Sequence, residues 1–154
     1  MTDIPEIPLE EFEVPEQTDV SELGIKNEYV GSLDIGVIGV GQAGSRVAKS
    51  FYDKGYKKCL AINTALGDLN PLELPANQKL KIGSLDGSGK NMSLGKKAVE
   101  EDSQKISDTV KKIVGNVDKI ILAFGCGGGS GSGSCSAMIE LLTKYLKADR
   151  KSVV

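Results

Sequence analysis

Residues 119–133 read KIILAFGCGGGSGSG, and they carry more information about the fold than any other part of the sequence. Residues 119–124 are a β-rich apolar run, which is typical of a strand buried in a parallel sheet. The glycines of residues 127–133 are interrupted only by Ser130 and Ser132, and a segment with the apolar spacing of an amphipathic helix follows. Because glycine leaves backbone N–H groups bare, this connection predicts an anion-binding nest to which both serine hydroxyls can donate.

Glycine makes up 19 of the 154 residues, and 13 of the 19 lie in three short clusters at residues 39–44, 83–95 and 125–133. Each cluster lies between a predicted strand and a predicted helix. A chain that is 40% hydrophobic, with 5 prolines and no three-residue glycine period, is neither collagen-like nor a disordered glycine linker. The glycines therefore mark the places where strands connect to helices.

The apolar pattern alternates between strands and helices along the chain. It predicts strands at residues 35–40, 59–62, 80–82 and 119–124, and helices at about 44–54, at about 94–114 and around 138–145. This order predicts a three-layer, Rossmann-like α/β fold with a parallel sheet, which places ligands beyond the carboxyl ends of the strands. Residues 152–154 have the composition of another strand, so we expect the chain to stop inside a larger, truncated fold.

The charges divide the chain into two parts. Residues 1–32 carry nine acidic residues and one lysine, a net charge of −8, whereas residues 33–154 carry a net charge of +6. Residues 1–32 are therefore predicted to be an acidic, flexible arm, either solvated or docked on the basic body or on a neighbouring copy. Residues 33–154 are long enough for one domain with a core.

The composition also excludes several functions. Without histidine, the chain has no catalytic triad and no imidazole metal ligand. Three cysteines without a C-x-x-C pair indicate neither a disulfide framework nor a zinc site, and they favour a reducing, cytoplasmic setting. We interpret Cys126 and Cys135 as small buried hydrophobic residues. The longest strongly apolar run, residues 120–124, cannot span a bilayer. Lysines interleaved with acids in residues 96–119 favour a solvated face, so we expect neither a membrane nor a nucleic-acid partner.

Residues 39–44, GVGQAG, are a further candidate for phosphate binding. They lie between a predicted strand and a predicted helix, where main-chain amides and a helix N-terminus can meet an anion. The same G-x-G-x-x-G pattern opens NAD(P)-binding Rossmann folds, in which the second strand ends in an acid that holds the ribose. Here Asn63 follows the second strand, so a dinucleotide is the alternative with less support.

Four segments, in order, resemble the phosphate loops of the tubulin/FtsZ family of filament-forming GTPases. We call them the first loop (39–44), the second loop (61–64), the third loop (87–91) and the fourth loop (127–133); the fourth matches the family signature G-G-G-[ST]-G-[ST]-G. The likeness is to FtsZ and to phage or plasmid tubulins, and it covers about residues 33–154. It implies nucleotide contacts by Gly39, Gly41, Gln42, Ala43, Gly44, Asn63, Gly87, Gly89, Lys90, Asn91, Gly127, Gly128, Gly129, Ser130, Gly131, Ser132 and Gly133.

The resemblance implies a protein that binds GTP or GDP with Mg²⁺, polymerises with copies of itself and completes GTP hydrolysis at subunit contacts. The family's catalytic acidic loop would follow residue 154, so no catalytic residue is assigned in this chain. Ala65 stands where FtsZ proteins usually have aspartate, which leaves the metal ligands unknown, with Asp68 as a candidate substitute. Ala65 also favours a second alternative, a non-hydrolysing assembly module of the same fold. Lys90 is interpreted either as a phosphate contact or as a solvated loop lysine. FtsZ proteins tend to have asparagine just after the first loop, near the base, whereas this chain has Ser45 and Arg46, so the resemblance leaves the selectivity for guanine open.

Overall fold

The computed structural model describes residues 33–149, with side chains for residues 33–145. The predicted acidic arm (1–32) and the predicted strand at 152–154 lie outside the described residues.

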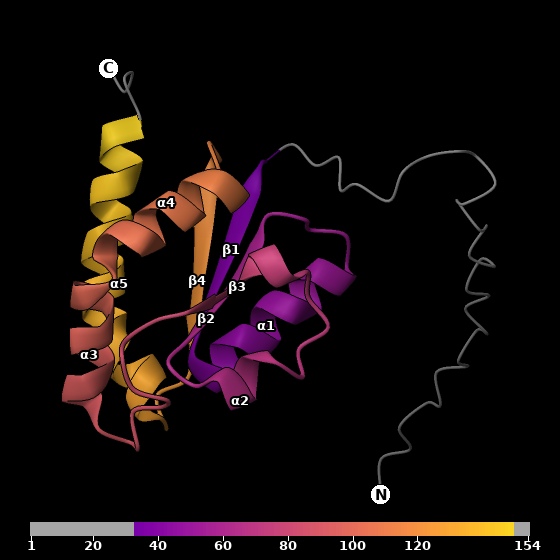
Figure 1. Cartoon of the computed structure of the whole chain (residues 1–154). Coiled ribbons are helices and arrows are strands. Elements are labelled where there is room, and N and C mark those ends of the chain that lie inside the picture. Colours follow the sequence, from indigo (N-terminus) through magenta and orange to yellow (C-terminus); the bar gives the residue numbers. More distant parts are fainter. Residues whose placement is uncertain (1–32, 150–154) are drawn as a thin grey trace, which may run out of the picture.

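Four parallel strands form one sheet in the order β3-β2-β1-β4. The strands are β1 (Ile35–Val40), β2 (Cys59–Asn63), β3 (Lys79–Lys81) and β4 (Lys119–Phe124). Because they all run the same way, their carboxyl ends lie along one edge of the sheet, the lower edge in Figure 1. The predicted parallel α/β fold is thus confirmed.

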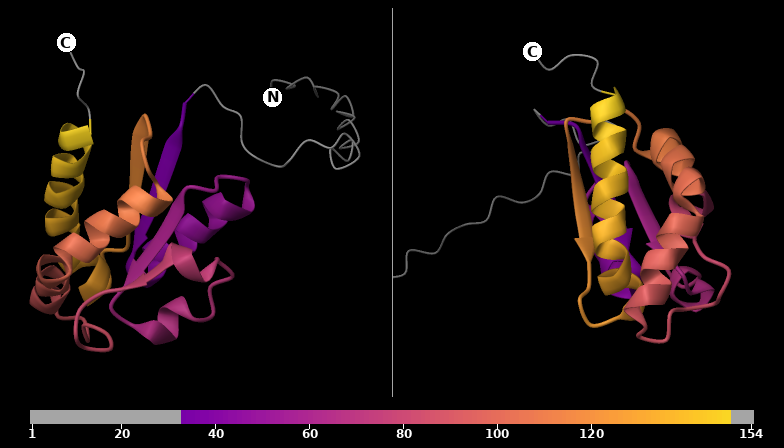
Figure 2. Two further views of the ribbon diagram at one scale, coloured as in Figure 1. Left: turned by 45° about the horizontal axis from the view of Figure 1, so that its top comes forward. Right: turned by 90° about the vertical axis from the view of Figure 1, so that its left-hand side faces the viewer.

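Helices cover both faces of this sheet. The helical elements are α1 (Gly41–Asp53), α2 (Leu66–Leu69), the 3₁₀ turn η2 (Ala76–Gln78), α3 (Met92–Glu101), α4 (Ser103–Ile113) and α5 (Gly129–Asp149). Helices α1 and α2 lie on one face, and α3, α4 and α5 lie on the other, which gives the predicted three layers (Figures 1 and 2).

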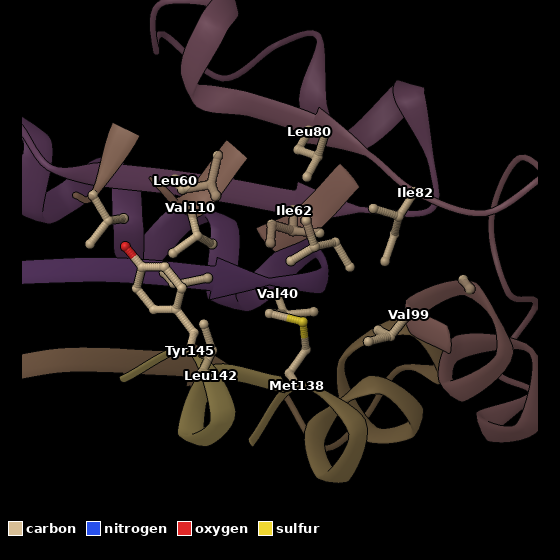
Figure 3. Packing of buried hydrophobic residues seen from close by; sticks show 14 of the residues in the cluster. Val40, Leu60, Ile62, Leu80, Ile82, Val99, Val110, Met138, Leu142 and Tyr145 are labelled. Atoms are coloured by element: carbon tan, nitrogen blue, oxygen red, sulfur yellow. The ribbon is translucent and has the colours of Figure 1, made fainter. Parts of the chain in front are cut away.

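The two faces of the central strands form two cores because successive side chains of a strand point to opposite sides. The larger core joins β1, β2 and β3 to α3, α4 and α5 (Figure 3) and includes Ile38, Val40, Leu60, Ile62, Leu80, Ile82, Val99, Ile106, Val110, Met138, Leu142 and Tyr145. On the other face, Val37 and Cys59 pack with Ala48 of α1. Strands β1 and β2 are therefore buried on both faces. The prediction that residues 119–124 form a buried strand is wrong, because β4 lies at the edge of the described sheet and its residues are half-buried or exposed.

Two helices replace the single helix predicted at residues 94–114. Asp102 lies between α3 and α4 and has φ −101° and ψ 19°, outside the helical region. Its carboxylate accepts a hydrogen bond of 2.7 Å from the N–H of Gly83, just beyond β3. This long-range contact holds the break, and an amphipathic pattern that continues through residue 102 could not reveal it.

Two helices also begin inside the predicted glycine loops, α1 at Gly41 and α5 at Gly129. Half of the residues in each first turn are therefore glycine, which allows close packing. A Cβ atom on Gly133 would overlap the carbonyl oxygen of Met92, and one on Gly95 would overlap that of Gly129. The N-terminal ends of α3 and α5 thus pack backbone against backbone.

A glycine-to-alanine pair tests this packing. We expect Gly133→Ala to lower the free energy of unfolding by about 1–3 kcal/mol, because the added methyl group forces α3 away from α5. Gly67→Ala is the control, since a Cβ on Gly67 meets nothing within 4 Å and this helical position needs no positive φ. Urea unfolding followed by circular dichroism measures both, and equal stability of the two variants would contradict the packing argument.

Candidate functional site

The carboxyl edge of the sheet holds a pocket of about 410 Å³, which we call the edge pocket. Its lining comes from three of the four predicted loops, from α2 and from Gly125, just after β4. The lining residues are Gly41, Gln42, Ala43, Asp68, Lys90, Gly125, Gly127, Gly128, Gly129, Ser130 and Gly131. The structure therefore brings together residues of the first, third and fourth loops that are up to 90 positions apart in the sequence.

The remaining predicted residues do not line the edge pocket; they are Gly39, Gly44, Asn63, Gly87, Gly89, Asn91, Ser132 and Gly133. Several of them shape the loops. A Cβ on Gly39 would overlap the carbonyl oxygen of Gly44, and Asn91 caps α3 by accepting a hydrogen bond of 3.0 Å from Ser93 N–H. Our residue set omitted Gly125, although its position directly after β4 in the glycine cluster was the available signal.

Two helix N-termini meet at the edge pocket. Gly41 has φ +74°, and a Cβ on it would lie 3.0 Å from the backbone nitrogen of Gly131, so the first turns of α1 and α5 touch. The first-turn N–H groups of a helix have no carbonyl partner within it and carry partial positive charge. Neither first turn contains an acidic residue. The pocket therefore favours an oxyanion.

Lys90 is the only cation among the described residues that line the edge pocket. Its φ is +64°, and within residues 33–149 every other residue with positive φ is a glycine. Holding a non-glycine side chain in this region costs about 1–3 kcal/mol, and such strain is concentrated at functional sites. The structure thus places a strained lysine beside two electropositive helix ends.

Asp68 is the single acidic residue in the same described lining. Its Oδ1 accepts a hydrogen bond of 3.2 Å from Gln42 Nε2, and its Oδ2 accepts one of 2.9 Å from Asn63 Nδ2. Asp68 therefore joins the first loop to the second and is held in one orientation by two amide donors. Asn63, which does not line the pocket, acts here as one of these supports.

The third loop and the residue before it are tied to the second loop and to the start of α2 by hydrogen bonds. Leu66 N–H donates to Asp86 Oδ1 over 2.8 Å, and Gly87 N–H donates to the Thr64 carbonyl over 3.1 Å.

The two serines of the fourth loop also form hydrogen bonds within the protein. The Oγ of Ser130 lies 2.7 Å from Thr64 Oγ1 and 2.9 Å from Ser88 Oγ, and the hydroxyl of Ser132 donates to the carbonyl oxygen of Cys126 over 2.7 Å.

The interpretation of Cys126 as a buried hydrophobe is wrong. Cys126 is exposed and Cys135 is half-buried. Burial raises the pKa of the Cys135 thiol, with a smaller contribution from nearby Cys126. Only Cys59 lies fully in the core, where burial raises its pKa to about 12.

Within residues 33–149, no helix is both long and apolar enough to cross a membrane. The same residues contain no group of three or more histidine, cysteine, aspartate or glutamate side chains placed to hold a metal ion.

A parallel sheet with glycine loops and helix N-termini at its carboxyl edge defines an α/β domain of the type that binds phosphate groups. More specifically, the chain belongs to the tubulin/FtsZ family, because residues 34–154 match the family model described as "Tubulin/FtsZ family, GTPase domain".

Individual relatives agree with this family. The chain is 35% identical over 113 residues to the tubulin-like protein CetZ of Pyrococcus furiosus, covering 69% of this chain and 31% of the relative. It is similar to the GDP-bound monomer of CetZ1 from Haloferax volcanii (TM-score 0.66, 31% identity), over 72% of this chain and 38% of that one. It is also similar to an empty FtsZ dimer of M. jannaschii (TM-score 0.61, 28% identity), over 75% of this chain and 34% of that one. The chain thus spans about a third of the length of these relatives.

Proposed function

We propose that this chain binds a guanine nucleotide, GTP or GDP, with the phosphate groups in the edge pocket. Two helix N-termini, neither with an acidic residue in its first turn, lie with Lys90 around a pocket of about 410 Å³, and this arrangement is the main support for the proposal. Membership of the tubulin/FtsZ family and the GDP bound to the CetZ1 relative support guanine as the base.

In this proposal the backbone does most of the binding. The N–H groups of residues 41–43 and 127–131 bind phosphate oxygens, and Lys90 neutralises part of their charge. Gly39, Gly44 and Gly133 act by letting neighbouring backbone segments approach closely. A dinucleotide has less support, because the side chain at the end of β2 is Asn63, which bonds to Asp68 rather than presenting a carboxylate.

Titration calorimetry with GTP, GDP and NADH tests this proposal. We expect wild type to bind both guanine nucleotides and not NADH. Lys90→Asn should weaken GTP binding about tenfold, because it removes a charge-assisted hydrogen bond while asparagine tolerates a positive φ. Lys112→Asn, at an exposed position of α4, is the control and should bind like wild type. A folded chain that binds no guanine nucleotide refutes the proposal.

We further propose that Mg²⁺ accompanies the nucleotide and that Asp68 is the residue that would hold it. Mg²⁺ in nucleotide sites is commonly bound through one or two carboxylates together with phosphate oxygens. Asp68 fits this role, since it is the acidic residue of the described pocket lining and two amide donors hold its carboxylate. The ion would offset phosphate charge that Lys90 alone leaves uncompensated.

The dependence of GTP affinity on Mg²⁺ tests the role of Asp68. For wild type, we expect tighter binding of GTP with Mg²⁺ than with a chelator. Asp68→Asn should reduce this ratio toward one, because the amide carries no charge for the ion. Asp108→Asn on α4, where Asp108 accepts a hydrogen bond from Gln104, is the matched control and should keep the wild-type ratio. An unchanged ratio in Asp68→Asn would exclude Asp68 as a ligand.

We also propose that copies of the protein associate through the edge that carries the pocket, with GTP hydrolysis completed at this contact. Three large apolar side chains are exposed near the loops: Leu66 (47%), Leu85 (57%) and Met92 (61%). Leu66 and Leu85 lie on adjoining segments, since Leu66 N–H donates to Asp86 Oδ1, and neighbouring exposed apolar side chains are typical of interaction surfaces. The FtsZ relative that crystallised as a dimer supports self-association. Ala65 keeps a non-hydrolysing assembly module as the second candidate.

Sedimentation velocity with GTP tests the association. We expect wild type to form species larger than the monomer, and Leu85→Glu to shift them toward monomer without changing GTP affinity. Leu33→Glu, at an equally exposed leucine beside the opposite end of β1, should associate like wild type. Wild type that stays monomeric with GTP would refute self-association of this chain. Assembly without phosphate release would favour the non-hydrolysing module.

A further inference from the structure

Three hydroxyl groups from three different loops form a cluster beneath the edge pocket. Ser130 is in the centre, with its Oγ 2.7 Å from Thr64 Oγ1 and 2.9 Å from Ser88 Oγ. Thr64 and Ser88 are buried, at 3% and 5% exposure. No other hydrogen bond of these hydroxyls is found within residues 33–149. We call Thr64, Ser88 and Ser130 the hydroxyl cluster.

The members of the cluster line two different cavities. Ser130 lines the edge pocket, whereas Thr64 and Ser88 line a second cavity of about 50 Å³, the side cavity, between the third loop and α3. Part of its lining is polar, including Ser84 besides the two hydroxyls of the cluster, and a cavity of that size has room for water. Ser130 can therefore bond to a ligand in the edge pocket, and Thr64 and Ser88 can bond to water in the side cavity.

The number of hydroxyl protons restricts what the cluster can do. Three hydroxyls carry three protons, and the two bonds between them use two, so one proton is left to donate. If Ser130 donates to a neighbour, the remaining proton belongs to Thr64 or Ser88, on the side-cavity side. If both neighbours donate to Ser130, its own proton is free for the edge pocket.

The third loop has an unusual backbone, with positive φ at three of its five residues, of which only Lys90 is strained because glycine adopts this region freely. Gly87, Gly89 and Lys90 have φ of +92°, +54° and +64°. Ser88 lies among them and is the residue through which the cluster reaches this loop. A Cβ on Gly129 would lie 2.5 Å from Ser88 Oγ and 2.6 Å from Asn91 N, so the third loop lies directly against the start of α5.

We propose that Ser130 is a positioning residue whose hydroxyl holds the second and third loops together, and that an anion in the edge pocket orders both loops through it. An oxyanion that accepts the Ser130 proton leaves Thr64 and Ser88 as the two donors to Ser130 Oγ. Both hydrogen bonds then run toward Ser130 Oγ. The third loop therefore loses the other donor and acceptor arrangements that are open to Ser88 when the pocket is empty. This inference rests on the proposed binding of nucleotide phosphates.

Hydrogen exchange of the amides of residues 87–91 tests the inference in the 154-residue chain. The informative pair is Thr64→Val, which removes the hydroxyl at nearly constant shape, and Thr64→Ser, which keeps it. Without ligand, we expect these amides to exchange about threefold to tenfold faster in Thr64→Val and Ser88→Ala than in Thr64→Ser, the range that corresponds to one buried hydrogen bond. Ser136→Ala, at an exposed serine of α5, should match wild type.

The same amides are then measured with GTP and with pyrophosphate. We expect either anion to slow their exchange in wild type, Ser130→Thr and Thr64→Ser, and to slow it less in Ser130→Ala and Thr64→Val at saturating ligand. A purely structural role would change the ligand-free rates but not this increment. Ser130→Thr keeps the hydroxyl and adds a methyl group, so a wild-type increment in this variant shows that the hydroxyl, and not the size of the side chain, is required.

The outcomes distinguish this inference from the proposed function. Equal increments in Thr64→Val and Thr64→Ser, with GTP bound to both, would overturn the inference and leave nucleotide binding intact. Absence of GTP and pyrophosphate binding to wild type would overturn nucleotide binding and, with it, the ordering of the loops by an anion. Equal ligand-free rates across all variants would overturn the positioning role of the cluster.

Discussion

The architecture depends on close backbone contact at the carboxyl edge of the sheet. There the first turn of α1 meets that of α5, and the start of α3 lies against α5, with carbonyl and amide groups where side chains would otherwise be. A Cβ atom at Gly44, Gly95 or Gly133 would overlap a neighbouring carbonyl group. Glycine is therefore required here mainly for lack of space, and backbone flexibility is a secondary consequence.

This close approach also determines the chemistry of the edge. Bringing helix N-termini together concentrates N–H groups that have no helical partner, and their partial positive charges add. One acidic residue, Asp68, and one basic residue, Lys90, complete the described lining of the pocket. Two amide donors hold the Asp68 carboxylate, and Lys90 has a left-handed backbone conformation. The first turns of α1 and α5 and the Asp68 carboxylate are thus in place before a ligand enters, which lowers the entropic cost of binding, whereas the third loop is the part that we propose a ligand orders.

Much of the fold could be predicted because the signals were local. The apolar runs that became β1, β2 and β4 are continuous, and the helices that follow have clear apolar stripes. The break at Asp102 could not be predicted, because the bond from Gly83 N–H that holds it comes from a strand connection 19 residues away. The start of α5 at Gly129 was missed for a related reason. Glycine has low helix propensity, and only packing against α3 makes a glycine-rich first turn favourable.

The sequence alone determined the family-like order of the four loops, the alternation of strands and helices, and the absence of histidine chemistry, since all of these are properties of residue type and spacing. Tertiary structure decided which polar groups face the pocket and which bond to one another. Ser130 and Ser132 are both candidate phosphate donors in sequence, yet the chain path brings Thr64 and Ser88 to Ser130 and directs Ser132 to the Cys126 carbonyl. A hydroxyl bonds to whichever partner the folded chain brings within about 3 Å, and spacing along the sequence does not specify that partner.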